Sequence, residues 1–414
     1  MKYGIHTLDD FDFKAKAVLC RLDLNSPYDR EKKVLRDTSR IRAAVPTIRE
    51  LSEKGARLVL MSHQGGDLEY QNFVSTEPHA AVLSDLLGKK IGFLDDVCGP
   101  AAREAIRALR AGAILLLDNV RYIAEEMTLF ETKLKLTPEE QAKTIVVRKL
   151  APLADYYVCD AFAAAHRDQP TLVGFEELLP SAMGRLFEKE YEVLSKIMTD
   201  PDKPSVFLLG GAKIEDAFLM MPAVLSKRIA DQILSTGLVA EVFLLALNID
   251  IGAPSKNLIF KKKLEPYIEM ARTILRDYAD KIVLPLDYAY VEGGRVEIDA
   301  GDLPTAHVIA DVGAKTIRLY KERISAAKTV FINGPSGIFE DPLTELGTKE
   351  LWEHVAATKN FSVIGGGDSI LAVNKYKVAD GFSYICTGGG AMVRFLSGEE
   401  LPVVKALKKS AGRF

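Results

Sequence analysis

The stretch FSVIGGGDS, residues 361–369, joins the pattern of a buried strand to a glycine turn and a helix start. Its apolar run suits a parallel sheet, and Asp368 or Ser369 suits the first turn of a helix. The same order returns in SVFLLGGAK (205–213), TVFINGPSG (329–337) and FSYICTGGG (382–390), with shorter runs in DQILSTG (231–237) and KIVLPLD (281–287). The second half of the chain therefore predicts strands and helices alternating around a parallel sheet.

The first half shows the same alternation with polar residues in place of the glycine clusters. Its apolar runs are AVLCRLDLN (17–25), RLVLMSH (57–63), AILLLDNV (113–120) and DYYVCDAF (155–162). Residues 38–53 predict an amphipathic helix with an apolar face of Ile41, Ala44, Val45, Ile48 and Leu51. Asp37 or Thr38 is the candidate cap at its start, and Gly55 is the candidate cap at its end. The predicted fold class is α/β, with two doubly wound, Rossmann-like parallel-sheet domains.

A chain of 414 residues exceeds what one hydrophobic core usually supports, which favours two domains. Residues 184–198 (GRLFEKEYEVLSKIM) predict a helix, and the turn-rich TDPDKP follows at 199–204. We therefore expect a first domain at 1–180, a connecting helix and linker at 181–204, and a second domain at 205–402.

Composition is that of an ordinary globular protein, with 48% hydrophobic and 27% charged residues, and it excludes collagen-like, disordered and disulfide-scaffold classes. The net charge of −3, with both signs interspersed, gives no general attraction to nucleic acid or acidic membranes. The N-terminus has no signal-peptide pattern and no apolar run reaches the roughly 18 residues of a membrane span, so we expect a cytoplasmic protein. The four cysteines are scattered, which predicts buried, reduced thiols.

Polar and mostly cationic residues follow the first-half strands. In open α/β sheets ligands bind beyond the carboxyl ends of the strands, and arginine matches carboxylate and phosphate oxygens. A single arginine is more often a surface ion-pair partner, but repetition at equivalent strand ends indicates a small, multiply anionic ligand. The residues are Asp23, Asn25, Arg40, His63, Arg121, His166 and Arg167.

Glycine clusters follow the second-half strands and predict a polyphosphate site, because glycine lets the backbone approach phosphate oxygens and the next helix adds N–H donors. A single cluster is more often a simple turn, whereas repeated clusters in one domain are not explained by turns alone. Asp368 is a candidate Mg²⁺ ligand of the bound nucleotide. Its alternative role, shared with Ser369, is to cap the helix that follows.

Together these segments resemble phosphoglycerate kinase. The matching stretches are RLDLNSP, SRIRAAVPTI, LMSHQG, LLLDNVRY, DAFAAAHR, LLGGAK, INGPSGIFE, VIGGGDS and CTGGGA, in the family's order from near residue 20 to near residue 407. The resemblance implies reversible phosphoryl transfer between ATP and 3-phosphoglycerate, giving ADP and 1,3-bisphosphoglycerate in glycolysis or gluconeogenesis. It also implies that the C-terminal segment, 403–414, returns to the first domain.

Residue roles follow from the resemblance. The first-half residues given above would bind 3-phosphoglycerate, with Arg40 reaching the transferring phosphoryl group. Lys213 would meet that group from the nucleotide side, and Gly366 and Gly389 would stabilise it through backbone N–H groups. The nucleotide set implied is Gly211, Lys213, Asn333, Glu340, Gly365, Gly366, Gly367, Asp368 and Ser369, with Asp368 holding Mg²⁺.

The acceptor is a carboxylate that is already ionised at neutral pH, so no catalytic base is needed and positioning and charge stabilisation suffice. We expect the two domains to close around the substrates before in-line transfer. The expected state is a monomer without nucleic-acid or membrane partners.

Departures from the family pattern concern charged positions. Gly66 stands where an arginine of SHxGRP is usual, and Ala217 stands where a second lysine often follows GGAK. Ser369 replaces the commoner threonine. The glutamine of SHQG and Glu215 resemble archaeal members.

Competing interpretations are weaker. A nicotinamide-dependent dehydrogenase would have a GxGxxG turn after its first strand, where this chain has DLNSP, and a nucleotide-sugar glycosyltransferase leaves the arginine and histidine group unexplained. The protein kinase and P-loop motifs are absent from the sequence. The remaining alternative is a paralogue that binds nucleotide without turnover, suggested by Gly66 and Ala217.

Overall fold

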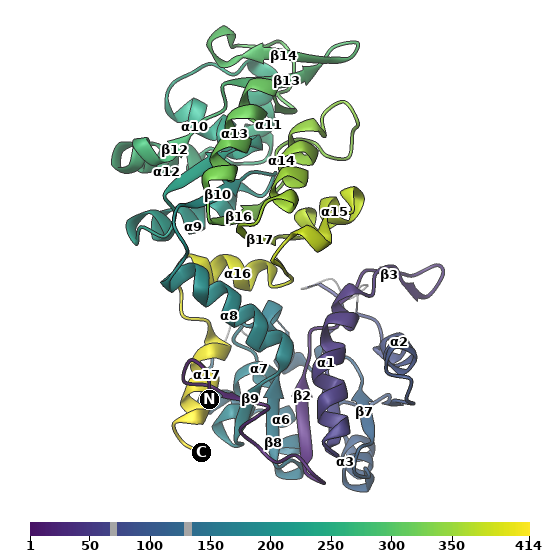
Figure 1. Cartoon of the computed structure of the whole chain (residues 1–414). Helices are drawn as coiled ribbons and strands as arrows, with labels where there is room; N and C mark the ends of the chain where they lie inside the picture. The colour runs from purple at the N-terminus through teal and green to yellow at the C-terminus, as the bar shows by residue number, and fades with distance from the viewer. Residues whose placement is uncertain (67–72, 128–134) are drawn as a thin grey trace. The chain divides into compact units, whose positions relative to one another are not determined.

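The computed structural model describes residues 1–66, 73–127 and 135–414, and the chain forms two compact units. The first unit comprises residues 1–192 and 400–414, and the second comprises residues 193–399. Both are α/β units built on a parallel sheet (Figure 1), so the predicted fold class is confirmed. Helix α8 (Arg185–Thr199) runs through the point where the first unit ends.

The first unit contains a seven-stranded sheet in the order β1-β9-β8-β2-β5-β7-β6, and every pairing in it is parallel. The strands are β1 (His6–Thr7), β2 (Ala17–Arg21), β5 (Arg57–Met61), β6 (Gly92–Leu94), β7 (Ile114–Leu117), β8 (Tyr156–Cys159) and β9 (Ser181–Met183). The main helices between them are α1 (Ser39–Glu53), α2 (Glu77–Leu87), α3 (Pro100–Ala108), α6 (Ile145–Leu150) and α7 (Pro170–Val173). A two-stranded ribbon, β3 (Tyr28–Asp29) with β4 (Val34–Leu35), precedes α1.

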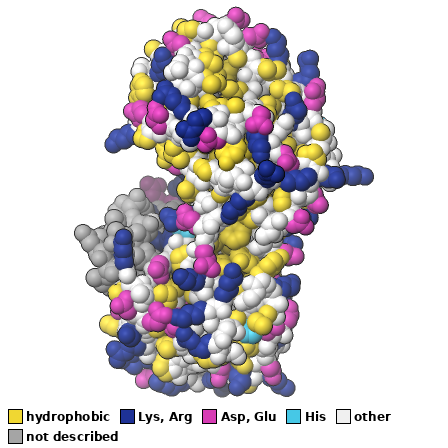
Figure 2. All heavy atoms as spheres, turned by 90° about the vertical axis from the view of Figure 1, so that its left-hand side faces the viewer, with side chains coloured by type: hydrophobic (Ala, Val, Ile, Leu, Met, Phe, Trp, Pro, Cys, Tyr) yellow, Lys and Arg dark blue, Asp and Glu magenta, His cyan; other side chains and the backbone are white. Residues whose placement is uncertain are grey.

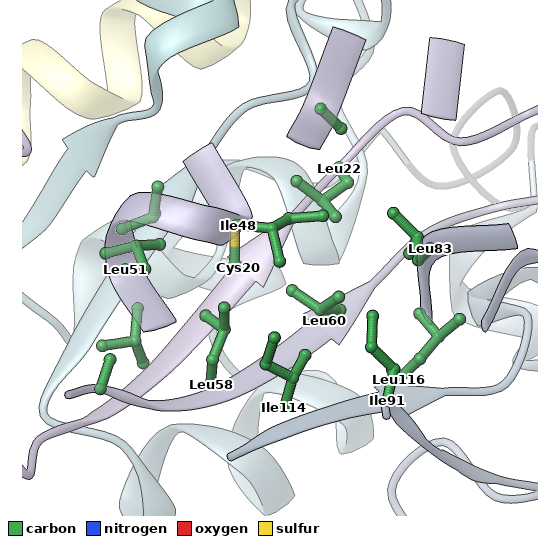
Figure 3. Packing of buried hydrophobic residues seen from close by; sticks show 14 of the residues in the cluster. Cys20, Leu22, Ile48, Leu51, Leu58, Leu60, Leu83, Ile91, Ile114 and Leu116 are labelled. Atoms are coloured by element: carbon green, nitrogen blue, oxygen red, sulfur yellow. The ribbon is translucent and has the colours of Figure 1, made fainter. Parts of the chain in front are cut away.

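Helix α1 packs its apolar face on this sheet. In Figure 3, Ile48 and Leu51 of the helix lie over Cys20, Leu58 and Leu60 of the strands, and all of these side chains are fully buried. Three predictions for the helix need refinement. Val45 is only partly buried, because it lies at the edge of the hydrophobic cluster. Thr38 is the N-cap residue, but its side chain makes no capping hydrogen bond. The hydrogen bond to the first turn comes instead from Asp37, whose Oδ1 accepts from Ser39 N at 2.6 Å.

The second unit contains a six-stranded parallel sheet in the order β12-β11-β10-β16-β17-β18. Its strands are β10 (Ser205–Leu209), β11 (Gln232–Ser235), β12 (Ile282–Val283), β16 (Thr329–Asn333), β17 (Phe361–Gly365) and β18 (Tyr384–Cys386). The helices are α9 (Ile214–Ser226), α10 (Gly237–Ala246), α11 (Ala253–Lys261), α12 (Pro266–Tyr278), α13 (Ala314–Ala326), α14 (Leu346–Ala357), α15 (Gly367–Tyr376) and α16 (Gly389–Leu396).

A small antiparallel sheet adds to the second unit and was not expected from the sequence. It pairs β13 (Asp287–Val291) with β14 (Arg295–Asp299) on one side and β15 (Asp311–Val312) on the other. The first two strands form a hairpin around Gly293 and Gly294, which short, charged runs such as RVEID signal only weakly.

The C-terminal helix α17 (Pro402–Ala411) belongs to the first unit, as the resemblance implies. Val403, Val404 and Leu407 are buried there, and Ser410 Oγ donates to the Leu179 carbonyl at 3.1 Å. Beyond the helix core, Lys409 and Arg413 both form ion pairs with Glu177, at 2.7 and 2.8 Å. Apolar burial and charge pairing together fix the end of the chain.

Surface and cysteine features agree with the composition. On the face seen in Figure 2, Lys and Arg side chains are interspersed with Asp and Glu. Cys20, Cys159 and Cys386 are buried, as predicted, whereas Cys98 is only half-buried. Among residues 1–66, 73–127 and 135–414, no helix has the length and apolarity to cross a membrane.

Candidate functional site

The loops after β2 and β5 are joined by side chains predicted to bind the acid. Asn25 Oδ1 accepts a hydrogen bond from Gly65 N at 3.0 Å, and Asp23 Oδ1 accepts from Asn25 N at 3.2 Å. The other Asp23 oxygen accepts from Arg40 Nη1 at 2.7 Å, while 39% of the Arg40 side chain stays exposed. Asp23 thus holds Arg40 at the start of α1 while part of the Arg40 side chain stays accessible.

His63 is buried, and the charges of four arginines act on it. Burial lowers its pKa well below the ordinary value of 6.5, and the guanidinium groups of Arg21, Arg121, Arg167 and Arg40 lower it further. The imidazole is therefore neutral at neutral pH. Because four arginines act on one ring, the structure gathers residues that are far apart in sequence into a single cationic cluster.

Arg21 is a member of this cluster that the sequence interpretation missed. It is fully buried, its Nη2 lies 3.3 Å from His63 Nδ1, and its Nε donates to Thr171 Oγ1 at 2.9 Å. The signal was present, because Arg21 interrupts the apolar run AVLCRLDLN at a position where a parallel strand is otherwise apolar. A charge buried in a strand needs partners, which marks a polar site.

Arg121, His166 and Arg167 lie on the loops after β7 and β8. Arg121 is 3% exposed and donates through Nη1 to the Gly65 carbonyl at 2.6 Å, which ties this loop to the one after β5. His166 and Arg167 are half-buried and follow the 3₁₀ turn at Phe162–Ala164. Gly66 is exposed beside Gly65, and Asp67 of the same motif lies outside the described residues.

The second unit contains a polar cavity of about 120 Å³ at the carboxyl end of its sheet. Helices α9, α15 and α16 all begin at this cavity, and their dipoles and unpaired N–H groups favour an anion there. The predicted residues that line it are Gly211, Lys213, Asn333, Gly366, Gly367, Asp368, Ser369 and Gly389.

Glycines at two of these turns are required by the backbone. Gly334 has φ +86, and a Cβ there would lie 2.3 Å from the Gly210 carbonyl oxygen. Gly366 has φ +100 and is the N-cap residue of α15. The alternative role of Asp368 or Ser369 as the cap is therefore wrong; instead, Ser369 Oγ accepts from Gly334 N at 3.0 Å and joins two of the glycine loops.

Two of the residues that line the cavity, Asn333 and Lys213, carry side-chain donors. Among the described residues no partner is found for Asn333 Nδ2, although this atom is buried. Lys213 is exposed at the N-cap of α9. Asp216 also lines the cavity, and burial raises the pKa of its carboxyl while Lys213 opposes that shift. Asn333 and Lys213 are thus positioned to receive an anion.

A second, more apolar cavity of about 350 Å³ adjoins the first and shares Gly211, Ala212 and Asp368 with it. Its walls include Leu238, Leu258, Ile309, Val312 and Phe339, and the exposed Glu340 also lines it. Gly365 lines neither cavity, because it is the last residue of β17 and packs against Met392, whose Sδ would lie 2.2 Å from a Cβ at this position.

Asp368 is the residue that suits a metal ion. It is half-buried and lines both cavities. Within the part of the chain that the structure describes, no group of three or more His, Cys, Asp or Glu side chains is close enough to hold a metal by itself. This donor set fits Mg²⁺, which commonly takes one or two carboxylates and completes its shell with phosphate oxygens and water.

Comparisons with known proteins show which family the chain is similar to. The family model described as phosphoglycerate kinase matches residues 8–399. Curated relatives with that name include the protein of Methanothermus fervidus, 42% identical over 99% of this chain and 98% of its own length, and that of Methanococcus maripaludis, 44% identical over 98% of each. The crystal structure of phosphoglycerate kinase from Pyrococcus horikoshii OT3 is similar with a TM-score of 0.90 and 41% identity, covering 99% of this chain and 100% of that one.

Proposed function

The chain belongs to the phosphoglycerate kinase family, and on that basis we propose how its two units divide the substrates of the reaction. The reaction is reversible phosphoryl transfer between ATP and the carboxylate of 3-phosphoglycerate, which gives ADP and 1,3-bisphosphoglycerate in glycolysis. We assign the acid to the first unit, expected at 1–180 with 403–414, and the nucleotide to the second, expected at 205–402.

One observation carries the nucleotide assignment: an apolar cavity continues into a glycine-lined polar one through Gly211, Ala212 and Asp368. A nucleotide has the same division, with a flat apolar base at one end and a polyanion at the other. The base would occupy the larger cavity and the phosphates the smaller, where helix N-termini and Lys213 offset their charge. Glu340, which lines the larger cavity, would accept from the ribose hydroxyls.

The cluster around His63 supports the acid assignment. 3-Phosphoglycerate carries a carboxylate and a phosphate on three carbons, and closely spaced arginines suit such a ligand. Asp23 and Asn25 would orient the hydroxyl group and the loops, and neutral His63 would donate or accept a hydrogen bond without adding charge. His166 and Arg167 would close the set from the loop after β8.

Catalysis is proposed to rest on positioning and charge stabilisation, since the carboxylate acceptor needs no base. Arg40 would approach the transferring phosphoryl group from the acid side and Lys213 from the nucleotide side. Backbone N–H groups at Gly366 and Gly389 would donate to its equatorial oxygens as charge develops. Closure of the two units around the substrates stays a prediction.

Mg²⁺ would be held by Asp368 and the nucleotide phosphates, and when bound it neutralises phosphate charge. Within this chain, the part of Asp368 is to fix the ion at the junction of the two cavities.

Because the reaction is a glycolytic step, we propose a cytoplasmic location. A monomeric state stays a prediction.

The test is a coupled assay with ATP, Mg²⁺ and 3-phosphoglycerate on the wild type, Arg40→Ala and Arg42→Ala. Arg42 is the matched control, because it is exposed on the same helix and its side chain bonds one turn back, to Thr38 Oγ1 at 3.3 Å. Arg40→Ala should lose activity while Arg42→Ala retains it. Absence of activity in all three proteins would favour the paralogue that binds nucleotide without turnover.

A further inference from the structure

Two buried polar atoms, on residues that line the apolar cavity, have no hydrogen-bond partner among the described residues. They are Glu241 Oε2 on α10 and Tyr288 Oη on β13, for which the described part of the chain offers no partner. Both residues line the cavity and both are 1% exposed. An unsatisfied buried polar atom costs free energy, so a pair of them in the wall of one cavity points to a ligand that satisfies them.

The Glu241 carboxyl is held in place by its surroundings. It lies one helical turn after Gly237 and Leu238, which line the same cavity. A hydrogen bond from Ser255 on α11 fixes one side of the carboxyl, and Ser255 Oγ itself accepts from Ile309 N at 3.0 Å. The bond from Ser255 lowers the pKa of Glu241, as a hydroxyl that donates to a carboxylate does, and Oε2 is the oxygen for which the described residues offer no partner.

Glu241 is a neutral group in this setting. Burial raises its pKa to about 8, and the only opposing cause is the bond from Ser255. The other charged side chains that line the cavity are Lys262, Asp311, Glu340 and Asp368, and none of them contributes to this shift. Ser255 donates to one oxygen and Oε2 has no partner among the described residues, so in the neutral carboxyl Oε2 is the oxygen free to carry the proton and act as a donor.

The apolar walls suit a purine ring, and the two polar atoms then define which purine fits. Adenine presents an acceptor at N1 and an amino donor at C6, whereas hypoxanthine and guanine present an N1–H donor and an O6 acceptor. A carboxyl O–H opposes the N1–H of the latter bases and complements N1 of adenine. The Tyr288 hydroxyl complements the adenine amino group as an acceptor.

Resting on the proposed function, we propose that Glu241, with Tyr288 beside it, determines the base specificity of the enzyme by donating to N1 of adenine and so selecting ATP over ITP and GTP. The proposal concerns the base alone. It assigns neither residue a part in phosphoryl transfer.

The experiment measures kcat/KM for Mg-ATP and Mg-ITP in the wild type, Glu241→Gln, Glu241→Met and Tyr288→Phe. ITP has the same ribose and phosphates as ATP and differs at the N1 and C6 edge, so the ATP/ITP ratio reports base recognition and not folding or catalysis. Glu241→Gln keeps a donor and should preserve the preference, while Glu241→Met should lower the ratio by about tenfold. Glu265→Gln, at an exposed position before α12, is the control and should leave the ratio unchanged.

An ATP/ITP ratio that is the same in Glu241→Met and in the wild type would overturn the proposal. Failure of the proposed function is seen separately, as no turnover of ATP with 3-phosphoglycerate by the wild type. In that case, the affinities of the same variants for ADP and for IDP, measured by calorimetry, still decide whether Glu241 selects the base. If Glu241→Met fails to fold, the near-isosteric variants Glu241→Gln and Tyr288→Phe are measured with both nucleotides instead. An unchanged ATP/ITP ratio in Tyr288→Phe, together with a lost preference for ATP in Glu241→Gln, would contradict the assignment of Glu241 as the donor.

Discussion

Gln64 and Ser26 form a reciprocal pair of hydrogen bonds between the loops after β2 and β5: Ser26 N donates to Gln64 Oε1 at 3.0 Å, and Gln64 Nε2 donates to the Ser26 carbonyl at 2.9 Å. Both residues are buried. The side-chain amide of Gln64 therefore replaces the backbone pairing that the chain loses where β2 and β5 end. It joins the loop that holds Asp23 and Asn25 to the loop that holds His63.

Replacing Gln64 by methionine should loosen these loops. The variant keeps the side-chain length but leaves the Ser26 N–H and C=O buried without partners, so the free energy of unfolding should fall by about 2–4 kcal/mol. The KM for 3-phosphoglycerate should rise, with that for ATP unchanged. Urea unfolding and initial-rate kinetics measure the two effects. Equal stability of variant and wild type would show that Gln64 is not the link between the loops.

His79 predicts a pH dependence of stability. Its Nε2 lies 3.0 Å from Gln64 Oε1, and burial lowers its pKa from 6.5 to about 4. Below about pH 6.5, His79 binds a proton in the unfolded chain but stays neutral in the folded one. The contribution of His79 to the free energy of unfolding is therefore complete above pH 6.5 and is lost as the pH falls towards 4. Between about pH 7 and pH 5, the wild type should lose about 2 kcal/mol more than His79→Gln.

Denaturant unfolding of both proteins at each pH measures this difference. The carboxylates titrate in both proteins, so their contribution to the free energy of unfolding drops out of the comparison. His63, which also has a lowered pKa, is common to the two proteins. Parallel stability curves for His79→Gln and the wild type would contradict the prediction.

Gly66→Arg tests the missing cation of the acid site. Gly66 is exposed next to Gly65, whose carbonyl accepts from Arg121. A charge-assisted hydrogen bond contributes about 1.5–3 kcal/mol, so the new arginine should lower the KM for 3-phosphoglycerate by about tenfold or more. Gly66→Met is the uncharged control for bulk at this position. A KM that does not change in the arginine variant would remove the argument that Gly66 weakens binding.

Lys213→Ala tests the nucleotide side. Lys213 is exposed at the N-cap of α9, so its loss should change stability by no more than about 0.5 kcal/mol. Loss of a positive charge at the transferring group should lower kcat by about 10²-fold or more. Lys227→Ala, an exposed lysine at the other end of the same helix, is the matched control. Near-normal turnover by the Lys213 variant, with thermal unfolding as the check on folding, would contradict its role.

The sequence by itself determined the strand-helix alternation, the polar ends of the first-half strands and the glycine turns of the second half. These features are local: a buried strand needs an apolar run, and a turn such as Gly334 needs a backbone without Cβ. Local sequence patterns therefore predict the residues at the carboxyl edges of both sheets. These residues include Asp23, Arg40, Lys213 and Asp368.

Tertiary structure alone decided which distant groups meet. Arg21 became part of the cationic cluster because four arginines act on one buried imidazole, and Glu241 became part of the apolar cavity because α10, α11 and β13 all contribute residues to its wall. The cap predicted at Asp368 or Ser369 failed for the same reason, since Ser369 Oγ bonds Gly334, 35 positions away. The role of a buried polar side chain depends on its partners, and only the folded chain supplies those partners.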